Sequence, residues 1–276
     1  MPTSAPTLTF IGAGNMAGSL IHGLLRDGHD PRRLRVADPI EAQLDKFSAL
    51  GVATFVDNNA AIDGAHVVVL AVKPQIAAGV VGALDKLQPG QLLLSIAAGI
   101  NLKSLTAWTS PNQAIVRCMP NTPALLGAGM SALYGNEQCT SVHTEAAEYI
   151  LNAAGETLWV SAEKALDAVT AVSGSGPAYF FLLMESMVQA GESLGLDRAT
   201  ATHLTLQTAY GAALMARESE DSPGTLRENV TSPGGTPAAA LEVMLDRDLP
   251  GTIMAALQAA DARAAQLAEE FGEHVA

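Results

Sequence analysis

A glycine-rich segment near the N-terminus, GAGNMAG at residues 12–18, constrains the fold of this chain more than any other feature. It follows the apolar run LTFI and precedes a helix-like stretch, so it fits the G-x-G-x-x-G/A pattern of dinucleotide-binding proteins. In that pattern Gly12 permits the tight turn, Gly14 lets the backbone approach a pyrophosphate, and Ala17 lets the helix pack closely on the strand. The free amides at the helix start bind the anion. The segment therefore predicts a dinucleotide site.

Short apolar runs alternate with longer helix-like stretches from residue 7 to residue 160, which is typical of a parallel sheet covered by helices. The run HVVVLAV has no polar alternation after His66, as expected for a strand that is buried on both faces. Each predicted helix ends at a glycine or a proline. Strands are predicted at residues 8–12, 34–38, 66–72, 92–97 and 114–119, with helices at 16–26, 40–50 and 76–87.

After about residue 162 the apolar residues recur at helical spacing, through residues 166–194, 199–216 and 253–271. The predicted class is therefore α/β, with an N-terminal Rossmann-type dinucleotide-binding domain over residues 1–161 and a C-terminal all-helical domain over residues 162–276. The apolar stripes of the second domain exceed what one small bundle needs to bury. They suggest a dimerisation surface, with a simple core as the commoner reading of such stripes.

Charge and composition exclude several classes of protein. The chain holds 15 Lys and Arg against 28 Asp and Glu, a net charge of −13, which repels the phosphates of nucleic acid. Two cysteines are too few for a secreted disulfide framework, and no basic stretch precedes the first apolar run, so we expect a cytoplasmic protein. Its apolar runs are far below the roughly 18 residues of a membrane helix. The six histidines show no ligand spacing, so no metal site is expected.

An acidic residue, Asp38, ends the second predicted strand about 20 residues beyond the glycine segment. There a carboxylate bonds the ribose hydroxyls of NAD and disfavours the 2′-phosphate of NADP. Against this, Arg32, Arg33 and Arg35 precede it closely and would attract a phosphate. The Asp38-Pro39 pair is also an ordinary turn sequence. The cofactor is accordingly NADPH or NADH, and the sequence leaves the choice open, with Asp38 slightly favouring NAD.

Three further predicted strands end in small, proline or amide residues, at the carboxyl edge where ligands of open α/β sheets bind. Residues 71–74 (AVKP) end one of them, and Lys73 is a candidate phosphate or ribose contact, although a lone lysine before a helix is often merely solvated. Residues 97–99 (AAG) are small enough for a nicotinamide ring to approach. Residues 119–123 (MPNTP) end the next strand.

Five motifs together resemble the pyrroline-5-carboxylate reductase family: GAGNMA, AVKPQ, CMPNTPA, DAVTAVSGSGPAYF and NVTSPGGT. They occur in order along essentially the whole chain, and the last two are specific to that family. The resemblance implies a Rossmann domain followed by a helical domain that forms an intertwined homodimer, often assembled into larger rings. It also implies an oxidoreductase of the CH–NH class that reduces 1-pyrroline-5-carboxylate to L-proline with NADPH or NADH, the last step of proline biosynthesis.

The resemblance places cofactor contacts on the glycine segment, on several strand ends and on Asn229 of the helical domain. Together with the strand-end residues argued above, the candidate cofactor-binding residues are Gly12, Ala13, Gly14, Asn15, Met16, Asp38, Asn58, Ala71, Val72, Lys73, Ala98 and Asn229. The candidate substrate-binding residues are Glu220, Ser232, Gly234, Gly235, Thr236 and, from the SGSG motif, Ser175. Thr236 is also the catalytic candidate, and the site is expected to be completed across the dimer.

The implied chemistry needs a clamp for the ring carboxylate and a hydrogen-bond donor near the imine nitrogen. Backbone amides of the SPGG turn before a helix supply the clamp, aided by the helix dipole. Members of the family commonly carry a threonine as the nitrogen donor where this chain has Pro237, which lacks both a hydroxyl and an amide hydrogen. Thr236 as N-cap and Pro237 as first helical residue would begin a helix over residues 238–245. Two alternatives follow from Pro237: a reductase of a related cyclic imine acid, or a non-catalytic nucleotide-binding paralogue.

Overall fold

The structure is a computed structural model that describes residues 5–85 and 87–272. The chain divides into two compact units. Unit 1 contains the chain up to Ser175 together with the residues from Ala260 onward, and unit 2 runs from Gly176 to Ala259. The domain boundary predicted at residues 161 and 162 falls within unit 1, just after its last strand, and it stays a prediction.

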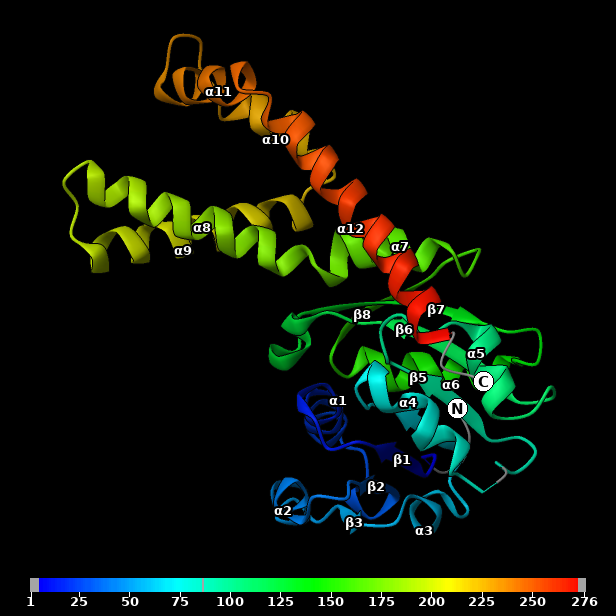
Figure 1. The fold of residues 1–276 in the computed structure, drawn as a ribbon. Helices are drawn as coiled ribbons and strands as arrows, with labels where there is room; N and C mark the ends of the chain where they lie inside the picture. Colours follow the sequence, from blue (N-terminus) through cyan, green and yellow to red (C-terminus); the bar gives the residue numbers. More distant parts are fainter. Residues whose placement is uncertain (1–4, 86, 273–276) are drawn as a thin grey trace. The chain divides into compact units, whose positions relative to one another are not determined.

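Unit 1 is built on one eight-stranded sheet with the strand order β3-β2-β1-β4-β5-β6-β7-β8 (Figure 1). Neighbouring strands are parallel except for the β6–β7 pair. In register, Phe10 lies between Val36 and Val69. The strands are β1 (Leu8–Ile11), β2 (Leu34–Ala37), β3 (Ala53–Phe55), β4 (Val67–Leu70), β5 (Leu92–Ser95), β6 (Ala114–Met119), β7 (Gly129–Gly135) and β8 (Gly155–Trp159).

Helices connect the strands of unit 1. The α-helices are α1 (Asn15–Arg26), α2 (Glu41–Ser48), α3 (Asn58–Ile62), α4 (Pro74–Gly82), α5 (Leu102–Trp108), α6 (Ser141–Asn152) and α7 (Ala165–Val169). Two short 3₁₀ helices, η1 (Pro31–Arg33) and η2 (Thr122–Leu126), lie before β2 and after β6. All five predicted strands are present, as are the three predicted helices between them, and the predicted fold class is confirmed.

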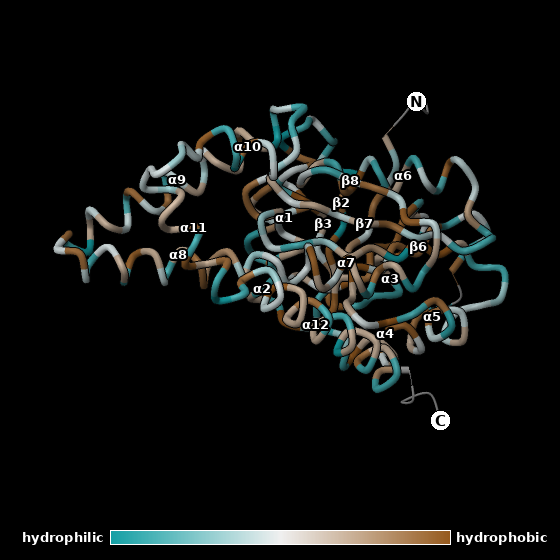
Figure 2. Tube along the Cα trace, turned by 90° about the horizontal axis from the view of Figure 1, so that it is seen from above, coloured by the Kyte–Doolittle hydropathy of each residue, from teal (hydrophilic) through white to brown (hydrophobic). Residues whose placement is uncertain are grey.

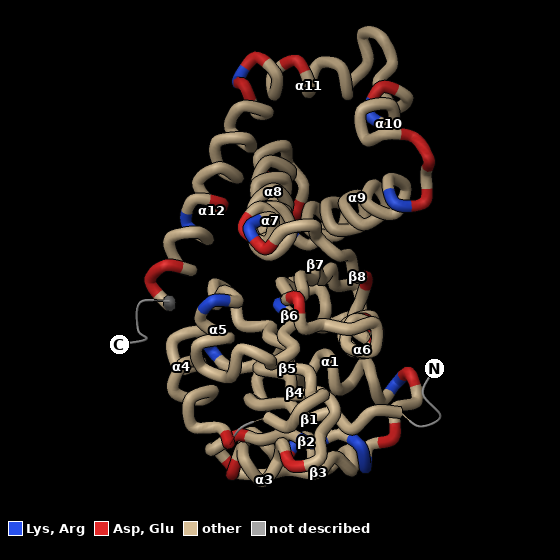
Figure 3. The backbone as a smooth tube through the Cα atoms, turned by 90° about the vertical axis from the view of Figure 1, so that its right-hand side faces the viewer, with Lys and Arg blue, Asp and Glu red and all other residues tan. Residues whose placement is uncertain are grey.

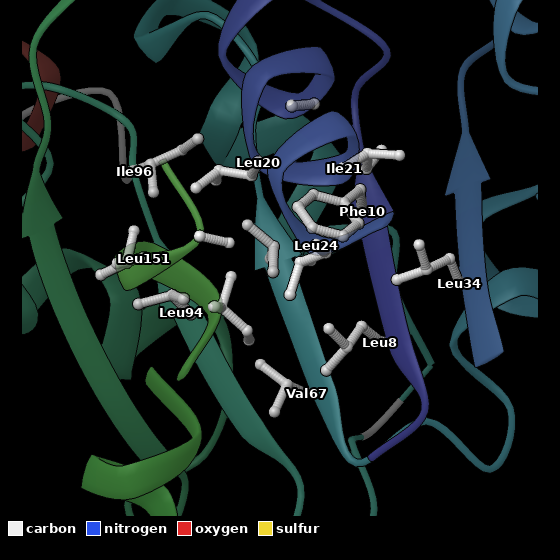
Figure 4. Packing of buried hydrophobic residues seen from close by; sticks show 14 of the residues in the cluster. Leu8, Phe10, Leu20, Ile21, Leu24, Leu34, Val67, Leu94, Ile96 and Leu151 are labelled. Carbon is white, nitrogen blue, oxygen red and sulfur yellow. The ribbon is translucent and has the colours of Figure 1, made fainter. Parts of the chain in front are cut away.

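Alternate residues of the strands pack into two apolar clusters, one on each face of the sheet. Leu8 and Phe10 of β1 lie in the cluster covered by α1, α2 and α6 (Figure 4). Ile11 lies in the cluster covered by α3, α4 and α5. β4 divides in the same way, with Val67 on the first face and Val68 on the second. A strand that is buried on both faces gains no polar alternation, which is why HVVVLAV is almost wholly apolar.

The helices of unit 2 are α8 (Gly176–Ser193), α9 (Arg198–Glu218), α10 (Pro223–Asn229), α11 (Thr236–Asp246) and the first part of α12 (Leu249–Gly272). The helical spacing predicted over residues 166–194 corresponds to α7 and α8, with a π-helical segment, η3 (Thr170–Gly174), between them. Among residues 5–85 and 87–272, every helix falls short of the length and apolarity that crossing a membrane requires.

Large apolar side chains of α8 and α9 are exposed in the single chain. Phe181 is 64% exposed and Leu206 is 50% exposed, and both line an open groove between the two helices. Figure 2 shows that hydrophobic and hydrophilic residues are interspersed along the helices of unit 2. Exposed side chains of this size are not the core of their own unit, so they favour an interface over a simple core.

Candidate functional site

The glycine segment forms the turn between β1 and α1, and its conformation requires glycine at the first position. Gly12 has a φ of 102°, and a Cβ added there would lie 2.6 Å from the carbonyl oxygen of Ala71. The amide of Gly12 donates to the carbonyl of Ala37 at 2.8 Å, and the amide of Ala71 donates to the carbonyl of Ile11 at 2.8 Å. The turn is therefore fixed between the ends of β2 and β4.

Gly14 has the opposite environment. It is the N-cap of α1 in an extended conformation, and a Cβ added there would meet no atom within 4 Å. The open side of Gly14 leaves room for a ligand beside the first amides of α1, which have no partner within their own helix. Below the turn, Ala17 is fully buried against the sheet. These features fit the pyrophosphate of a dinucleotide, which binds where the backbone is accessible and amides point outward.

Asp38 is bound to the glycine segment in the structure. Its Oδ2 accepts a hydrogen bond from the amide of Ala13 at 3.0 Å, and its Oδ1 accepts one from the amide of Ile40 at 3.0 Å. The half-buried carboxylate thus links the turn after β1 to the turn after β2. Sequence reasoning placed Asp38 at this edge but did not anticipate the two backbone partners.

The other candidate cofactor residues of unit 1 follow the carboxyl ends of neighbouring strands. Asn58 begins α3 just after β3, Lys73 is the exposed N-cap of α4 after β4, and Ala98 is exposed after β5. Parallel strands present these ends on one edge of the sheet, where ligands of such sheets bind. Unit 1 therefore carries every candidate cofactor residue except Asn229, which ends α10 in unit 2.

The π-helical segment lies next to the end of β6 and leads into Ser175. The amide of Ser175 donates to the carbonyl of Thr170 at 2.8 Å, which is the wide turn of a π-helix. Asn121 donates from Nδ2 to the carbonyl and to the hydroxyl of Ser173, at 3.3 and 3.2 Å. Its Oδ1 accepts from the amide of Met130 at 2.9 Å. Sequence reasoning missed this role of Asn121, although the residue stands in the CMPNTPA motif.

An ion pair between Arg117 and Glu163 lies at the same edge of unit 1. Arg117 is 8% exposed, and its Nη1 lies 2.6 Å from Oε1 of Glu163, which also accepts from the amide of Leu102 at 2.6 Å. Burial raises the pKa of the neighbouring Asp167 carboxyl, although the positive charge of Arg117 opposes that shift. Sequence reasoning missed this cluster. Its one signal is a charged residue within the apolar strand AIVRCM.

The ends of β5 and β6 border a cavity of about 40 Å³ beside this ion pair. Leu166 and Asp167 of α7 line it, together with Leu267 of α12. The end of α12 packs on the loop after β5, where Phe271 would meet a Cβ added to Gly99 at 3.1 Å. The loop containing Ala98 is therefore held from one side by the last helix of the chain.

The candidate site residues of unit 2, those for the substrate and Asn229 for the cofactor, lie at three helix ends. Glu220 follows α9 and is exposed, Asn229 ends α10, and residues 232–236 lead into α11. The predicted N-cap at Thr236 is wrong: Gly235 is the N-cap and Thr236 is the first helical residue. The reason is local, because the amide of Gly235 closes a turn onto the carbonyl of Ser232 at 3.0 Å with Gly234 at a φ of 69°.

A glycine N-cap changes what the start of α11 offers to a ligand. Gly235 makes no side-chain cap, so the first amides of α11 are not occupied by their own cap. Pro237 stands in this first turn and has no amide hydrogen. Thr236 therefore brings both an amide and a hydroxyl to the N-terminus of α11, which the preceding glycines leave accessible.

A nearly all-parallel sheet, a glycine turn open to a pyrophosphate and small residues at the following strand ends define a dinucleotide-dependent oxidoreductase with an added helical unit. Residues 163–267 match the family model described as pyrroline-5-carboxylate reductase dimerisation. Residues 7–99 match the family model described as NADP oxidoreductase, coenzyme F420-dependent. The pyrroline-5-carboxylate reductase of Pseudomonas aeruginosa is 51% identical over 272 residues, which covers 98% of this chain and 100% of that protein. The chain belongs to the pyrroline-5-carboxylate reductase family.

Two solved structures extend the comparison. The pyrroline-5-carboxylate reductase of Coxiella burnetii is 41% identical with a TM-score of 0.89, covering 95% of this chain and 98% of that one. The pyrroline carboxylate reductase of Plasmodium falciparum, solved with NADP bound, is 30% identical with a TM-score of 0.86, covering 96% of this chain and 99% of that one. The family expected from the sequence motifs is thereby confirmed, as is the expectation of an NADPH or NADH cofactor.

Proposed function

We propose that this chain reduces 1-pyrroline-5-carboxylate to L-proline with NADPH or NADH, as the last step of proline biosynthesis. The observation that carries the proposal is the match along the whole chain to a reductase of that name, at 51% identity. The open glycine turn of unit 1 supports it, because it has the shape that a dinucleotide needs.

The cofactor is held by unit 1 in this proposal. The amides at the start of α1 bind the pyrophosphate, Asp38 faces the adenosine ribose, and the small residues after β5 make room for the nicotinamide. When bound, the dinucleotide supplies the hydride that reduces the C=N carbon. The protein orients the two reactants, and proximity provides much of the rate.

The substrate is held by its carboxylate. The amide of Thr236 and the dipole of α11 attract the anion, while Gly234 and Gly235 keep side chains out of its way. Ser232 and Ser175 contribute hydroxyls, and Glu220 completes the set of substrate contacts in this proposal, while Asn229 contacts the cofactor. The chain contributes these groups from both units, so we expect the complete site only in the assembled homodimer.

The imine nitrogen must be protonated or hydrogen-bonded as the hydride arrives. Thr236 is our catalytic candidate, because its hydroxyl is the one that lies next to Pro237 at the start of α11. Loss of one positioned proton donor lowers rates between about tenfold and about 10⁴-fold, so a chain with Pro237 in place of a threonine can be slow without being inactive.

The helical unit is proposed to form a homodimer, which is able to assemble further into rings. Support comes from the dimerisation model that matches residues 163–267 and from the exposed apolar side chains of α8 and α9. We retain residues 1–161 as the dinucleotide-binding domain and residues 162–276 as the dimerisation and substrate domain. A cytoplasmic location is proposed from the unpaired state of both cysteines, Cys118 and Cys139.

The test is steady-state oxidation of NADPH and of NADH by the full chain with 1-pyrroline-5-carboxylate, with L-proline identified as the product. The Pro237→Thr variant and the six-membered homologue of the imine acid are run in parallel. Turnover of the five-membered ring by the unmodified chain supports the proposal. Faster turnover of the larger ring favours the second candidate function, a reductase of a related imine acid, for which Pro237 is the specific observation.

A further inference from the structure

The end of β2 determines which dinucleotide this site accepts. NADPH differs from NADH by one phosphate on the 2′-oxygen of the adenosine ribose. In sheets of this type that ribose lies at the carboxyl end of the second strand, next to the glycine turn. The groups at the end of β2 therefore meet either two ribose hydroxyls or a doubly charged phosphate. The inference uses the dinucleotide site of the proposed function, but not the identity of the imine.

Backbone hydrogen bonds hold the carboxylate of Asp38 at the carboxyl end of β2. Both of its oxygens accept backbone hydrogen bonds, from Ala13 on one side and from Ile40 on the other, each at 3.0 Å. A carboxylate oxygen has two lone pairs, so these bonds still leave acceptor capacity for ribose hydroxyls. A phosphate has no hydrogen to donate in its ionised form, and it meets only the negative charge.

The arginines that the sequence places shortly before Asp38 are directed elsewhere. Arg32 and Arg33 precede β2, so the length of a four-residue strand, roughly 13 Å, separates them from its carboxyl end. Arg32 pairs with Asp30 at 2.8 Å, and Arg33 donates to the carbonyl of Ala5 at 2.8 Å. Figure 3 shows acidic and basic residues around β2 and β3. A charged residue at the carboxyl end of its strand lies near the cofactor edge, whereas one at the amino end lies at the opposite edge of the sheet.

Arg35 is also committed to another part of the chain. It lies within β2, and its Nη1 donates to the carbonyl of Ala61 at 3.1 Å and to the carbonyl of Asp63. These two partners belong to the end of α3 and the residue after it, near the amino edge of the sheet where β4 begins. None of the three arginines is thus placed to neutralise a 2′-phosphate.

The lysines nearest in sequence also lie elsewhere: Lys46 is placed over the ring of Phe47, and Lys73 follows β4, which β1 separates from β2. Residues 36–45 and 53–72, which form the carboxyl ends of β2 and β3 and the segments after them, contain neither lysine nor arginine. They contribute acids instead: Glu41 in the first turn of α2 and Asp57 as the N-cap of α3, both exposed. A phosphate at the ribose would meet the carboxylate of Asp38, and these two ranges offer no cation to compensate the repulsion.

We infer that this chain selects NADH over NADPH, and that Asp38 is the specificity-determining residue, which accepts the ribose hydroxyls and repels a 2′-phosphate. The preference for NADH is not inferred from the family, since the structural neighbour from Plasmodium falciparum was solved with NADP bound. The selectivity follows from side chains of this chain at one strand end.

The test is calorimetric binding of two pairs of ligands to the full chain: NADH with NADPH, and 5′-ADP with 2′,5′-ADP. The adenine nucleotides isolate the 2′-phosphate from all chemistry at the nicotinamide. We expect NADH and 5′-ADP each to bind about tenfold or more tightly than their 2′-phosphorylated counterparts, since one uncompensated charge contact near a surface is worth at least one tenfold step.

Two variants and one control separate the charge of Asp38 from its structural role. Asp38→Asn keeps an acceptor oxygen for one backbone amide while removing the charge, and Ile40→Arg adds a cation and leaves Asp38 intact. Both are expected to strengthen binding of NADPH and 2′,5′-ADP relative to the unphosphorylated ligands. Asp45→Asn removes a charge from an exposed position further along α2 and is expected to leave both ratios unchanged.

Equal or tighter binding of the 2′-phosphorylated ligands by the unmodified chain would overturn the inference. So would ratios that neither Asp38→Asn nor Ile40→Arg moves, or a chain that binds none of the four ligands. A chain that prefers NADH but reduces no cyclic imine would retain this inference and lose the proposed function, so the two failures are distinguishable.

Discussion

The side-chain Nδ2 of Asn121 donates hydrogen bonds to the carbonyl and the hydroxyl oxygen of Ser173, and its Oδ1 accepts a hydrogen bond from the backbone amide of Met130. One residue at the end of β6 thus joins β7 to the π-helical segment that leads into Ser175. A π-helix leaves backbone groups in irregular positions, and such segments occur frequently at functional sites. We therefore predict that Asn121 positions this part of the proposed imine site.

Substitution of Asn121 by alanine removes all three of these hydrogen bonds. We expect the free energy of unfolding to fall by about 1–3 kcal/mol, because partly buried groups of Ser173 and Met130 lose their hydrogen-bond partner. We also expect kcat/KM for the imine to fall by about 100-fold, since a shift of one ångström in a reacting group has an effect of that size. Urea denaturation and steady-state kinetics measure the two effects.

Asn121→Asp is the matched control, because it keeps the acceptor for Met130 and loses only the donors to Ser173. Its kcat should fall while the calorimetric Kd for the cofactor stays unchanged. A variant that unfolds more easily but keeps the full kcat would show that Asn121 only stabilises the fold.

The buried ion pair gives a second prediction, on stability. Glu163→Gln leaves Arg117, which is 8% exposed, without its charged partner. Removing one member of a buried pair costs roughly 3–5 kcal/mol, and the partial exposure of Glu163 places the expected loss near the lower end, about 3 kcal/mol. Equilibrium urea unfolding of the full chain measures it.

The control for that prediction is an ion pair of the same length on the surface. Arg263 and Glu270 of α12 also lie 2.6 Å apart, but both side chains are about half exposed. Arg263→Gln should therefore change the free energy of unfolding by less than about 1 kcal/mol. Similar losses in the two variants would contradict the assignment of Arg117 and Glu163 as a buried pair.

The sheet could be predicted because its signal is local. In β1 and β4 every position is buried and nearly every side chain is apolar, and the glycine turn marks where the first strand ends. β3, β7 and β8 were missed for a physical reason: β3 has three residues, β7 mixes buried with partly exposed positions, and β8 alternates partly exposed with exposed positions. Short or half-exposed strands acquire their structure from pairing with neighbours rather than from their own sequence.

Residues of the site were predictable only where a turn identifies them. Gly12 and Gly14 stand in a recognisable spacing, and the structure gives them opposite environments that the spacing alone cannot distinguish. Asp38 accepts from Ala13, which is 25 residues away in sequence, and Asn121 donates to Ser173, which is 52 residues away, so no local pattern predicts these two contacts. The π-helix was missed because its apolar spacing differs little from that of an α-helix over five residues.

A pH effect on stability follows from His29. This side chain is 3% exposed, and its Nδ1 lies 2.9 Å from the hydroxyl of Tyr149. Burial lowers its pKa from 6.5; the backbone of Arg33 and the charge of Asp30 act in the opposite direction, and the charge of Arg33 adds slightly to the lowering. Below pH 6.5 His29 therefore binds a proton more readily in the unfolded chain than in the folded chain.

The free energy of unfolding should accordingly fall as the pH drops below 6.5, with a slope from this group of at most about 1.4 kcal/mol per pH unit, until the pH passes the pKa of the folded state. His29→Gln should reduce that slope. Urea unfolding between pH 5 and pH 8, about the range over which histidine titrates, checks the difference between the two chains. The same slope in both would assign the pH effect to other groups.

The two glycines of the turn give the sharpest comparison. Gly12→Ala places a Cβ 2.6 Å from the carbonyl of Ala71 at a φ of 102°, so the backbone must move. The expected loss in the free energy of unfolding is at least about 2 kcal/mol, from the left-handed backbone and the overlap together. Binding of NADH should fall with it, because the turn is displaced.

Gly14→Ala tests the ligand rather than the fold. Its φ of −71° suits alanine and its Cβ would meet no protein atom, so the free energy of unfolding should stay within about 1 kcal/mol of the unmodified chain or rise. The added methyl occupies the side on which a pyrophosphate approaches the backbone, so binding of NADH and of 5′-ADP should weaken about tenfold or more. Thermal unfolding and calorimetry on both alanine variants measure the contrast. Undiminished binding by Gly14→Ala would place the pyrophosphate elsewhere and remove the physical basis for the dinucleotide site.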